Sequence, residues 1–372
     1  MEKNFTFDGS MSREVLNNYL SRAVTHTGIG YDNDTYSETF EDDLRMLKNE
    51  GAKFIGRAAL VWHISVPDPQ GFAFARERLA RAHEIDPEFL FQACVFECIY
   101  RPFVESTKIP AYVFEEFGLP VEDRCFSFDA MKVPGREDRI WGWEGTSTPD
   151  ITHVEAQMWF FYRAAEYIRV GFEAIHLGQV CHIGCNDPDF TNWKSVIDRI
   201  RRFAKQNARR HYVLIDAHTL GWLRQDETMF DYNAFPIRLR EVVDRPTECI
   251  CEENYLDSMF NEKDGLCRPF LVEFDNFGCS PTPGQPTPQS HYAWGYDEIS
   301  WFSQLDPAYR AEFLNYIHDW VKARYPEGWV QMPSRRCITG VPGGDYRANT
   351  RSEASPRGWS DEETVKSIFA RS

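Results

Sequence analysis

Short runs rich in β-branched and aromatic residues alternate along this chain with longer stretches in which apolar residues recur at the period of an α-helix. The eight runs cover residues 5–9, 52–62, 88–97, 172–180, 211–219, 235–243, 268–276 and 328–334. Strands that alternate with helices form parallel sheets, and several of the runs are almost wholly apolar, as expected of strands covered on both faces. Because such a set of strands is more naturally closed than open, the sequence predicts an α/β fold, a (β/α)8 TIM barrel with elaborated βα loops.

The barrel is expected to occupy residues 1–340 as a single domain, followed by a C-terminal extension at residues 341–372. Polar residues, glycine and serine in GVPGGDYRANTRSEASPRGWSDEE indicate the extension. Residues 101–150 are long for a connection, and we interpret them as an elaborated loop. The Pro-rich and then aromatic residues 280–298 follow the seventh strand. They are therefore expected at the barrel mouth, the end where the strands finish and where the loops build active sites.

The charge of the chain excludes one class of partner. Lys and Arg number 41 against 57 Asp and Glu, a formal charge of −16 that argues against binding to nucleic acid. Neither a stretch of about 18 apolar residues nor an apolar N-terminal segment occurs, so we predict no membrane insertion and no secretion. We expect a cytoplasmic protein whose ten cysteines are reduced thiols.

Polar side chains gather at the C-terminal ends of the predicted strands. The third strand ends at Glu97, the fourth carries His176 and Gln179, the fifth Asp216 and His218, and the seventh Glu273 and Asp275. In a barrel these ends open onto one pocket, while the middles of the strands face a packed core. Arg57 and Arg238 are expected at the rim, where they either bind substrate or pair with Glu273.

A site with several carboxyl groups suits the hydrolysis of a glycosidic bond, which requires one protonated and one ionised carboxyl group. Glu273 is the first candidate because it follows the apolar residues FLV and would project into the pocket. The second is Glu97, whose apolar neighbours would raise its pKa, or Asp216, which ends the VLID strand. The neighbouring side chains expected to bind substrate are Asp275, His176, Gln179 and His218.

Aromatic residues make up 15% of the chain, and several lie in predicted loops, among them Trp143, Trp294 and Tyr296. Apolar rings are not expected in loops unless they cover something. They either stack on sugar rings or form a lid over the barrel mouth, and the two interpretations are compatible.

These features together resemble barrel glycoside hydrolases. The resemblance rests on Glu273 within LVEFDN on the seventh strand, on the aromatic loops and on the carboxylates at other strand ends. It implies hydrolysis of a short oligosaccharide or glycoside without a cofactor, with Glu273 in the place of a nucleophile. In the best-known clan of these enzymes a Glu ends the fourth strand, whereas this chain has Gln179 there, in HLGQV.

Two alternatives remain open. Barrel-type sugar isomerases and epimerases hold a divalent cation with Glu, Asp, His and Glu at successive strand ends. Glu97, Asp216, His218 and Glu273 offer such a set of oxygen and imidazole ligands. A non-catalytic carbohydrate-binding barrel is the second alternative, and Gln179 in place of an acid favours it.

Overall fold

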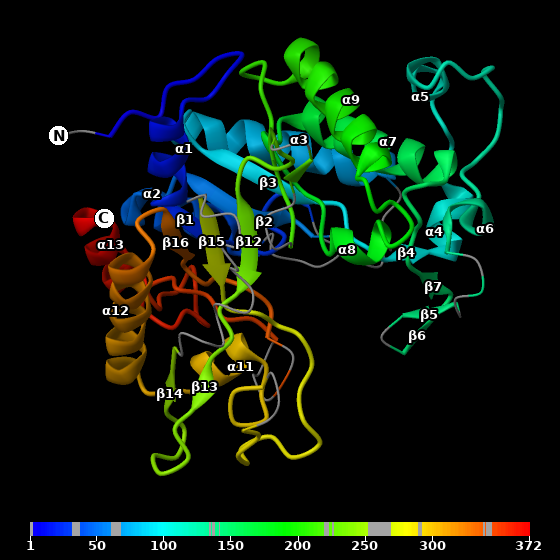
Figure 1. Ribbon diagram of the computed structural model, residues 1–372. Helices are drawn as coiled ribbons and strands as arrows, with labels where there is room; N and C mark the ends of the chain where they lie inside the picture. The colour runs from blue at the N-terminus through cyan, green and yellow to red at the C-terminus, as the bar shows by residue number, and fades with distance from the viewer. Residues whose placement is uncertain are drawn as a thin grey trace.

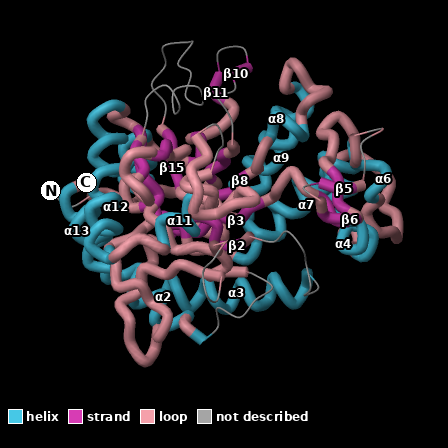
Figure 2. The backbone as a smooth tube through the Cα atoms, turned by 90° about the horizontal axis from the view of Figure 1, so that it is seen from below, coloured by secondary structure: helices cyan, strands magenta, loops and turns pink. Residues whose placement is uncertain are grey.

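The computed structural model describes residues 3–31, 38–60, 68–133, 135, 138–140, 142–218, 223–224, 227–251, 269–288, 292–337, 339 and 344–372. Eight parallel strands surround one axis in the centre of the molecule, with the large helices outside them (Figures 1 and 2). The barrel strands are β1 (Ala23–Thr25), β2 (Phe54–Ala59), β3 (Leu90–Cys94), β8 (Ala174–His176), β9 (Leu214–Asp216), β12 (Asn233–Pro236), β15 (Phe270–Glu273) and β16 (Gly328–Gln331).

Two parallel sheets, β1-β2-β3-β8-β9 and β12-β15-β16, join at both edges to close the barrel. On one side the amide of Thr25 donates to the carbonyl of Met332 at 2.8 Å. On the other side the amide of Ala234 donates to the carbonyl of Ala217 at 3.2 Å. The fold is therefore the (β/α)8 barrel that the sequence predicts, and closure places the last strand beside the first.

The outer layer consists of helices whose apolar faces cover the strands. The long ones are α2 (Phe40–Glu50), α3 (Asp68–Ile85), α7 (Val154–Val170), α9 (Thr191–Asn207), α12 (Pro307–Arg324) and α13 (Glu362–Arg371). In α9 the buried side chains from Trp193 to Ala204 form one stripe, as its apolar spacing predicts. The helix α12 begins where Asp306 accepts hydrogen bonds from the amides of Ala308 and Tyr309. None of the helices in the described ranges is long and apolar enough to span a membrane.

Shorter elements lie in the connections. They are α1 (Arg13–Leu20), α4 (Arg101–Ser106), α5 (Ala111–Glu116), α6 (Phe128–Met131), α8 (Val180–Ile183) and α11 (Glu298–Ser303). The short strands pair as β4 (Ile99–Tyr100) with β7 (Thr146–Ser147), β5 (Arg139–Ile140) with β6 (Trp143–Glu144), β10 (Leu223–Arg224) with β11 (Glu227–Thr228), and β13 (Arg240–Glu241) with β14 (Cys249–Ile250). Residues 101–150 therefore form the elaborated connection that their length indicates.

The predicted first strand, residues 5–9, is wrong. The first barrel strand is β1, and Phe5 and Phe7 instead pack under the barrel against Tyr19 and the first residues of the strands. The ring centroids of Phe5 and Tyr19 are 5.2 Å apart in an edge-on arrangement. An apolar segment that caps the N-terminal end of a barrel has the same residue pattern as a short strand, so periodicity does not separate the two.

The predicted sixth strand is displaced. The strand β12 begins at Asn233 and ends at Pro236, and Arg240 and Glu241 belong to a separate hairpin with β14. Five other predicted strands each contain a barrel strand within their bounds, although residues 61–62, 219 and 268 lie outside the described residues. The remaining prediction, residues 328–334, contains β16.

Residues 344–372, in the predicted C-terminal extension, are packed against the barrel. The helix α13 contacts α2 and α12. Tyr346 is fully buried, and its hydroxyl donates to Asp361 at 2.7 Å. Asp361 in turn accepts a hydrogen bond of 2.7 Å from Arg310 on α12. The domain boundary at residue 340 stays a prediction.

Candidate functional site

A layer of polar side chains fills the barrel interior just below its mouth. Side chains two residues apart on a strand point to the same side. The first inward layer is apolar and contains Phe54, Leu90, Ala174, Leu214 and Leu271. Two residues further along the same strands lie Gly56, Gln92, His176, Asp216 and Glu273. The buried surface of the barrel thus changes from apolar to polar at the depth where active sites are built in this fold.

Asp216 and His176 form a buried pair within this layer. The Nδ1 of His176 lies 2.7 Å from Oδ2 of Asp216, and Oδ1 of Asp216 accepts from Gln92 at 2.8 Å and from the hydroxyl of Tyr232 at 2.9 Å. Burial raises the pKa of Asp216 to about 7, although the hydrogen bond from Tyr232 and the charge of Arg57 act in the opposite direction. Burial, with the charge of Arg57, holds the pKa of His176 well below its usual range. The imidazole is therefore neutral at neutral pH.

Glu273 is an ionised carboxylate held between two guanidinium groups. Its side chain is 3% exposed. Oε1 pairs with Arg57, Oε2 accepts from Arg335 at 3.1 Å, and His218 Nε2 lies 3.6 Å from Oε1. Burial alone would raise the pKa of Glu273, but the charges of Arg57 and Arg335 outweigh burial and hold it well below its usual range. Desolvation and strong electrostatic stabilisation therefore act on the same carboxylate.

An irregularity in β2 brings Arg57 to this carboxylate. The pairing of β2 with β3 shifts between Ile55 and Ala59, and Arg57 has a positive φ of 58°. Its main-chain amide donates to Oε1 of Gln92 at 3.0 Å, and its Nη2 lies 2.9 Å from Nε2 of His218. Strained backbone of this kind persists where the surroundings fix it, and it is frequent at functional sites.

Glu97 lies at the end of the third barrel strand against the end of the fourth. Its Oε2 accepts from the main-chain amide of Gln179 at 2.9 Å, and its Oε1 accepts from the side-chain amide at 3.2 Å. Gly178 makes room for this carboxylate, because a Cβ at that position would lie 2.1 Å from Oε2 of Glu97. The structure thus joins Glu97 and Gln179, which the sequence places 82 residues apart.

Asp275 and Arg238 form a separate pair beyond the strand ends. The Nη1 of Arg238 donates to Oδ2 of Asp275 at 3.2 Å. Glu298, at the start of α11, accepts from the main-chain amides of Arg238 at 2.6 Å and of Asp275 at 2.7 Å. Burial raises the pKa of Glu298 to about 7, opposed by the charge of Arg238. Of the two arginines considered as partners of Glu273, Arg57 is the one that pairs with it.

The three aromatic residues singled out in the sequence occupy different environments. Trp294 is 5% exposed, and its indole N–H donates to the carbonyl of Glu248 at 2.8 Å, so its ring packs in the core. Tyr296 is half-buried against the same core. Trp143, on the hairpin of β5 and β6, is 55% exposed. The position of Trp294 matches the lid interpretation better than sugar stacking.

The four residues of the isomerase alternative do not form a metal cage. Among the described residues, no three or more His, Cys, Asp and Glu side chains are arranged to hold a metal ion. Both oxygens of Glu273 are already engaged by guanidinium groups, Oε1 by Arg57 and Oε2 by Arg335. Glu97 binds the amides of Gln179 instead.

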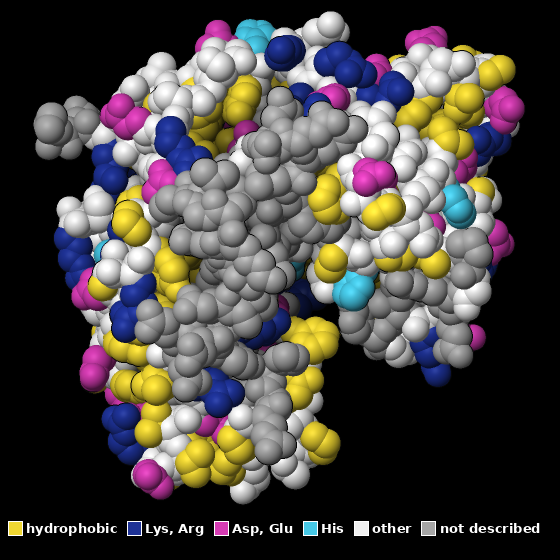
Figure 3. Space-filling model, in the orientation of Figure 1, with side chains coloured by type: hydrophobic (Ala, Val, Ile, Leu, Met, Phe, Trp, Pro, Cys, Tyr) yellow, Lys and Arg dark blue, Asp and Glu magenta, His cyan; other side chains and the backbone are white. Residues whose placement is uncertain are grey.

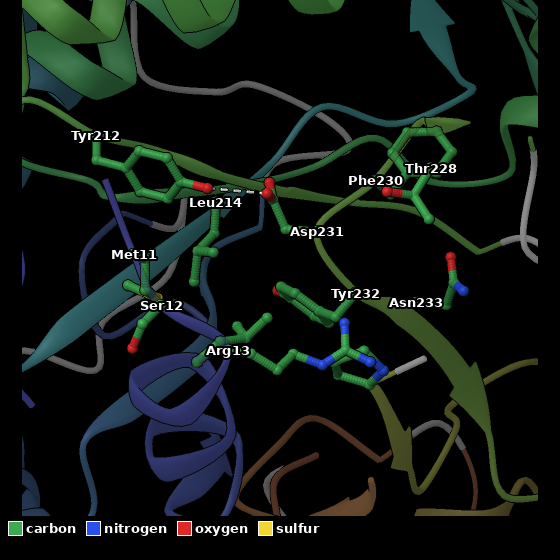
Figure 4. Close-up of a pocket in the computed structure, with 12 residues that line it drawn as sticks. Met11, Ser12, Arg13, Tyr212, Leu214, Thr228, Phe230, Asp231, Tyr232 and Asn233 are labelled. Carbon is green, nitrogen blue, oxygen red and sulfur yellow. Dashed lines mark hydrogen bonds between the residues drawn. The ribbon is translucent and has the colours of Figure 1, made fainter. Parts of the chain in front are cut away.

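The surface drawn in Figure 3 is hollowed between the part of the molecule that carries α11 and β13 and the part that carries α8. A separate cavity of about 200 Å³ lies at the opposite end of the barrel, between α1 and the beginnings of β9 and β12 (Figure 4). Tyr212 and Asp231 line it and share a hydrogen bond of 2.9 Å. Because active sites in this fold lie at the C-terminal ends of the strands, we place the candidate site around Glu273 and not in this cavity.

Several residues of the site were missed in the sequence. Gln92 and Gln331 are amides within otherwise apolar strands, a signal that could have been noticed. Tyr232 precedes β12, where an aromatic residue looks like any other core position. Arg335 lies beyond the last strand, and no local pattern marks it.

Comparison with solved structures gives matches to carbohydrate-processing enzymes over nearly the whole chain. The debranching enzyme of Nostoc punctiforme, in its native form, matches with a TM-score of 0.52 and 13% identity, covering 95% of this chain and 80% of that one. The ligand-free cyclic α-maltosyl-(1→6)-maltose hydrolase of Arthrobacter globiformis matches with a TM-score of 0.50 and 11% identity, covering 95% and 83%. The (β/α)8 barrel of this chain is therefore similar in fold to these two enzymes. No protein-family model matches the sequence, and no curated protein matches it either.

Proposed function

We propose that this protein is an enzyme that hydrolyses a glycosidic bond in a short oligosaccharide or glycoside, with Glu273 as its essential ionised carboxylate. The observation that carries the proposal is the environment of Glu273, a buried carboxylate kept charged by Arg57 and Arg335 at the end of a barrel strand. The transition state of glycoside hydrolysis has oxocarbenium character, so a fixed negative charge beside the sugar ring stabilises it. A desolvated carboxylate does this more strongly than one in water.

The second carboxyl group in this proposal is Glu97. It lies at the strand end, and its hydrogen bonds to Gln179 fix its direction. Asp216 has the raised pKa of a general acid, but it lies within β9, is fully buried and is paired with His176 inside the barrel. We therefore assign proton transfer to Glu97 and a positioning role to Asp216.

Asp216 positions His176. The contact between Nδ1 of His176 and Asp216 fixes the direction of the ring, so Nε2 can form a hydrogen bond with a sugar hydroxyl. His218 lies between this pair and Glu273, with its ring centroid 4.8 Å from that of His176. His218 thus connects the pair of Asp216 and His176 to Glu273.

The replacement Glu273→Gln tests the proposal because it removes the charge and keeps the shape. The substrates are aryl glycosides together with α-linked glucose oligosaccharides, the class that the name of the Arthrobacter globiformis hydrolase suggests. We expect kcat/KM to fall at least about a hundredfold, as happens when one electrostatic contact to a transition state is removed. The matched control is Glu84→Gln, since Glu84 is an exposed residue of α3 far from the barrel mouth. Turnover that survives Glu273→Gln would exclude this mechanism.

A carbohydrate-binding barrel without catalysis is the second candidate. It is favoured by Gln179, an amide at the strand end where the resemblance to barrel glycoside hydrolases expects an acid. Sugar binding without turnover across the same substrates would support it, whereas turnover that depends on Glu97 would exclude it.

A further inference from the structure

Some of the buried polar atoms without hydrogen-bond partners belong to Gln331 and Arg335, which neighbour Glu273, or to residues close to this group. In the part of the chain that the structure describes, they are Oγ1 of Thr27, Nε2 of His176, Nε2 of Gln331, Oγ of Ser334 and Nε of Arg335. Buried polar atoms in proteins almost always have partners. The atoms beside Glu273 therefore offer free hydrogen-bonding capacity that a ligand or water can satisfy.

The strand pairing shows how these atoms are placed. Gln331 is the direct neighbour of Glu273 across β15 and β16, and its amide lies over Gly56, where a Cβ would come within 1.9 Å of Nε2. Thr27 and Ser334 meet where the first and last strands close the barrel, because the amide of Thr27 donates to the carbonyl of Ser334 at 3.2 Å.

The chemistry of this group matches hydroxyl groups. Gln331 Nε2 and Arg335 Nε only donate, the ring nitrogen of His176 donates or accepts according to the tautomer, and Thr27 and Ser334 do both. A sugar ring presents adjacent hydroxyls that donate and accept. Because only Arg335 carries a fixed charge among these residues and its charge is already paired with Glu273, a neutral polyol fits better than an anion.

A second feature lies just outside this group. Phe277, four residues after Glu273, is 41% exposed, and its ring stacks on Tyr292 with centroids 6.5 Å apart and planes at 24°. The preceding residue, Asn276, accepts a hydrogen bond of 2.9 Å from Arg335, which also binds Glu273. This connection ties the aromatic pair to the carboxylate. An exposed aromatic face is a surface on which a sugar ring stacks.

We propose that the site is built for a substrate of at least two sugar rings. One ring binds beside Glu273 through the group that includes Gln331, and the next ring stacks on Phe277. This inference rests on the proposed function because it takes Glu273 as the point of cleavage. It adds a length requirement and two specificity-determining residues.

Calorimetric binding to the Glu273→Gln protein tests the inference without turnover. The probes are glucose with maltose and cellobiose, mannose with mannobiose, and xylose with xylobiose. For at least one pair we expect the disaccharide to bind about tenfold more tightly, a gain typical of one well-placed aromatic contact. Phe277→Ala should remove this gain and leave monosaccharide binding unchanged, whereas Gln331→Leu should weaken both about tenfold.

The matched control is Phe74→Ala. Phe74 lies on α3 with 39% exposure, and its ring also contacts a neighbour, the guanidinium of Arg78 at 4.1 Å. It should change neither affinity, and thermal melting of each variant should confirm that the protein folds. Equal effects of Phe277→Ala on both members of a pair, no effect of Gln331→Leu, or no binding by any pair would overturn the inference. Turnover of aryl glycosides without length-dependent binding would overturn this inference alone, and length-dependent binding without turnover would overturn hydrolysis alone.

Discussion

Replacing Gly178 with alanine tests the position of Glu97 without removing its carboxylate. Gly178 has a positive φ of 62°, and a Cβ there would lie 2.1 Å from Oε2 of Glu97 and 3.3 Å from its main-chain nitrogen. The carboxylate must therefore move away. Once it moves, the main-chain amide of Gln179 loses the acceptor that now lies at 2.9 Å.

The expected loss of stability has two parts. Placing a residue with a Cβ in the left-handed region costs about 1–2 kcal/mol. A part-buried amide left without its acceptor costs about 1–3 kcal/mol more. The free energy of unfolding should thus fall by about 2–5 kcal/mol, and kcat/KM on a glycoside should fall by about a hundredfold because the proton donor is displaced.

The control Gly118→Ala separates backbone strain from displacement of Glu97. Gly118 has a φ of 65°, and a Cβ there would meet nothing within 4 Å. This variant should lose only about 1–2 kcal/mol, the cost of the backbone conformation, and should keep its activity. Urea denaturation gives the stabilities, and initial rates give kcat/KM. If the two variants lose equal stability and both stay active, the proposed role of Glu97 is refuted.

Three further replacements give direct tests. In the folded protein the pKa of Asp216 is raised from 3.8 to about 7, so the folded protein binds this proton more tightly than the unfolded chain does. This difference contributes about 4 kcal/mol of stability below pH 4, and the contribution is lost as the pH rises to 7. Asp216→Asn should flatten this fall in thermal melting between pH 4 and 7, and an unchanged slope would contradict the assignment. Burial also raises the pKa of Glu50 well above its usual range, and neither of its oxygens has a hydrogen-bond partner among the described residues. Glu50→Gln should therefore melt higher than the wild type at pH 8 and nearly equally at pH 4. Trp294→Phe should lower the free energy of unfolding by about 1–3 kcal/mol because the carbonyl of Glu248 loses its hydrogen-bond donor. A loss of sugar binding without a loss of stability would instead support a role of Trp294 in stacking on sugar.

The sequence predicted the barrel strands that are buried on both faces, because these strands are long apolar runs. The helices between them also show a clear helical period of apolar residues. It failed at residues 5–9, where the chain caps the barrel, and at residues 235–243, where Arg238 adopts a positive φ beyond the end of β12. Periodicity describes which side of an element is apolar. It does not describe what packs against that side.

The same distinction holds at the site. Strand ends are recognisable from local residue patterns, and these patterns alone place Glu97, Asp216 and Glu273 at one end of the barrel. The partners of these carboxylates do not follow from local patterns. The sequence offered Arg57 and Arg238 equally as partners of Glu273, and the bulge in β2 decides between them.

The sequence by itself therefore determined a barrel with carboxylates at its mouth, because strand order and strand ends follow from local patterns. Only the tertiary structure decided the charge of each carboxylate. Glu273 is ionised because Arg57, 216 residues away, and Arg335, 62 residues away, reach it inside the barrel. Asp216 keeps its proton up to about pH 7 because the same closure buries it. Ionisation depends on burial and on nearby charges, and both are set only when the last strand meets the first.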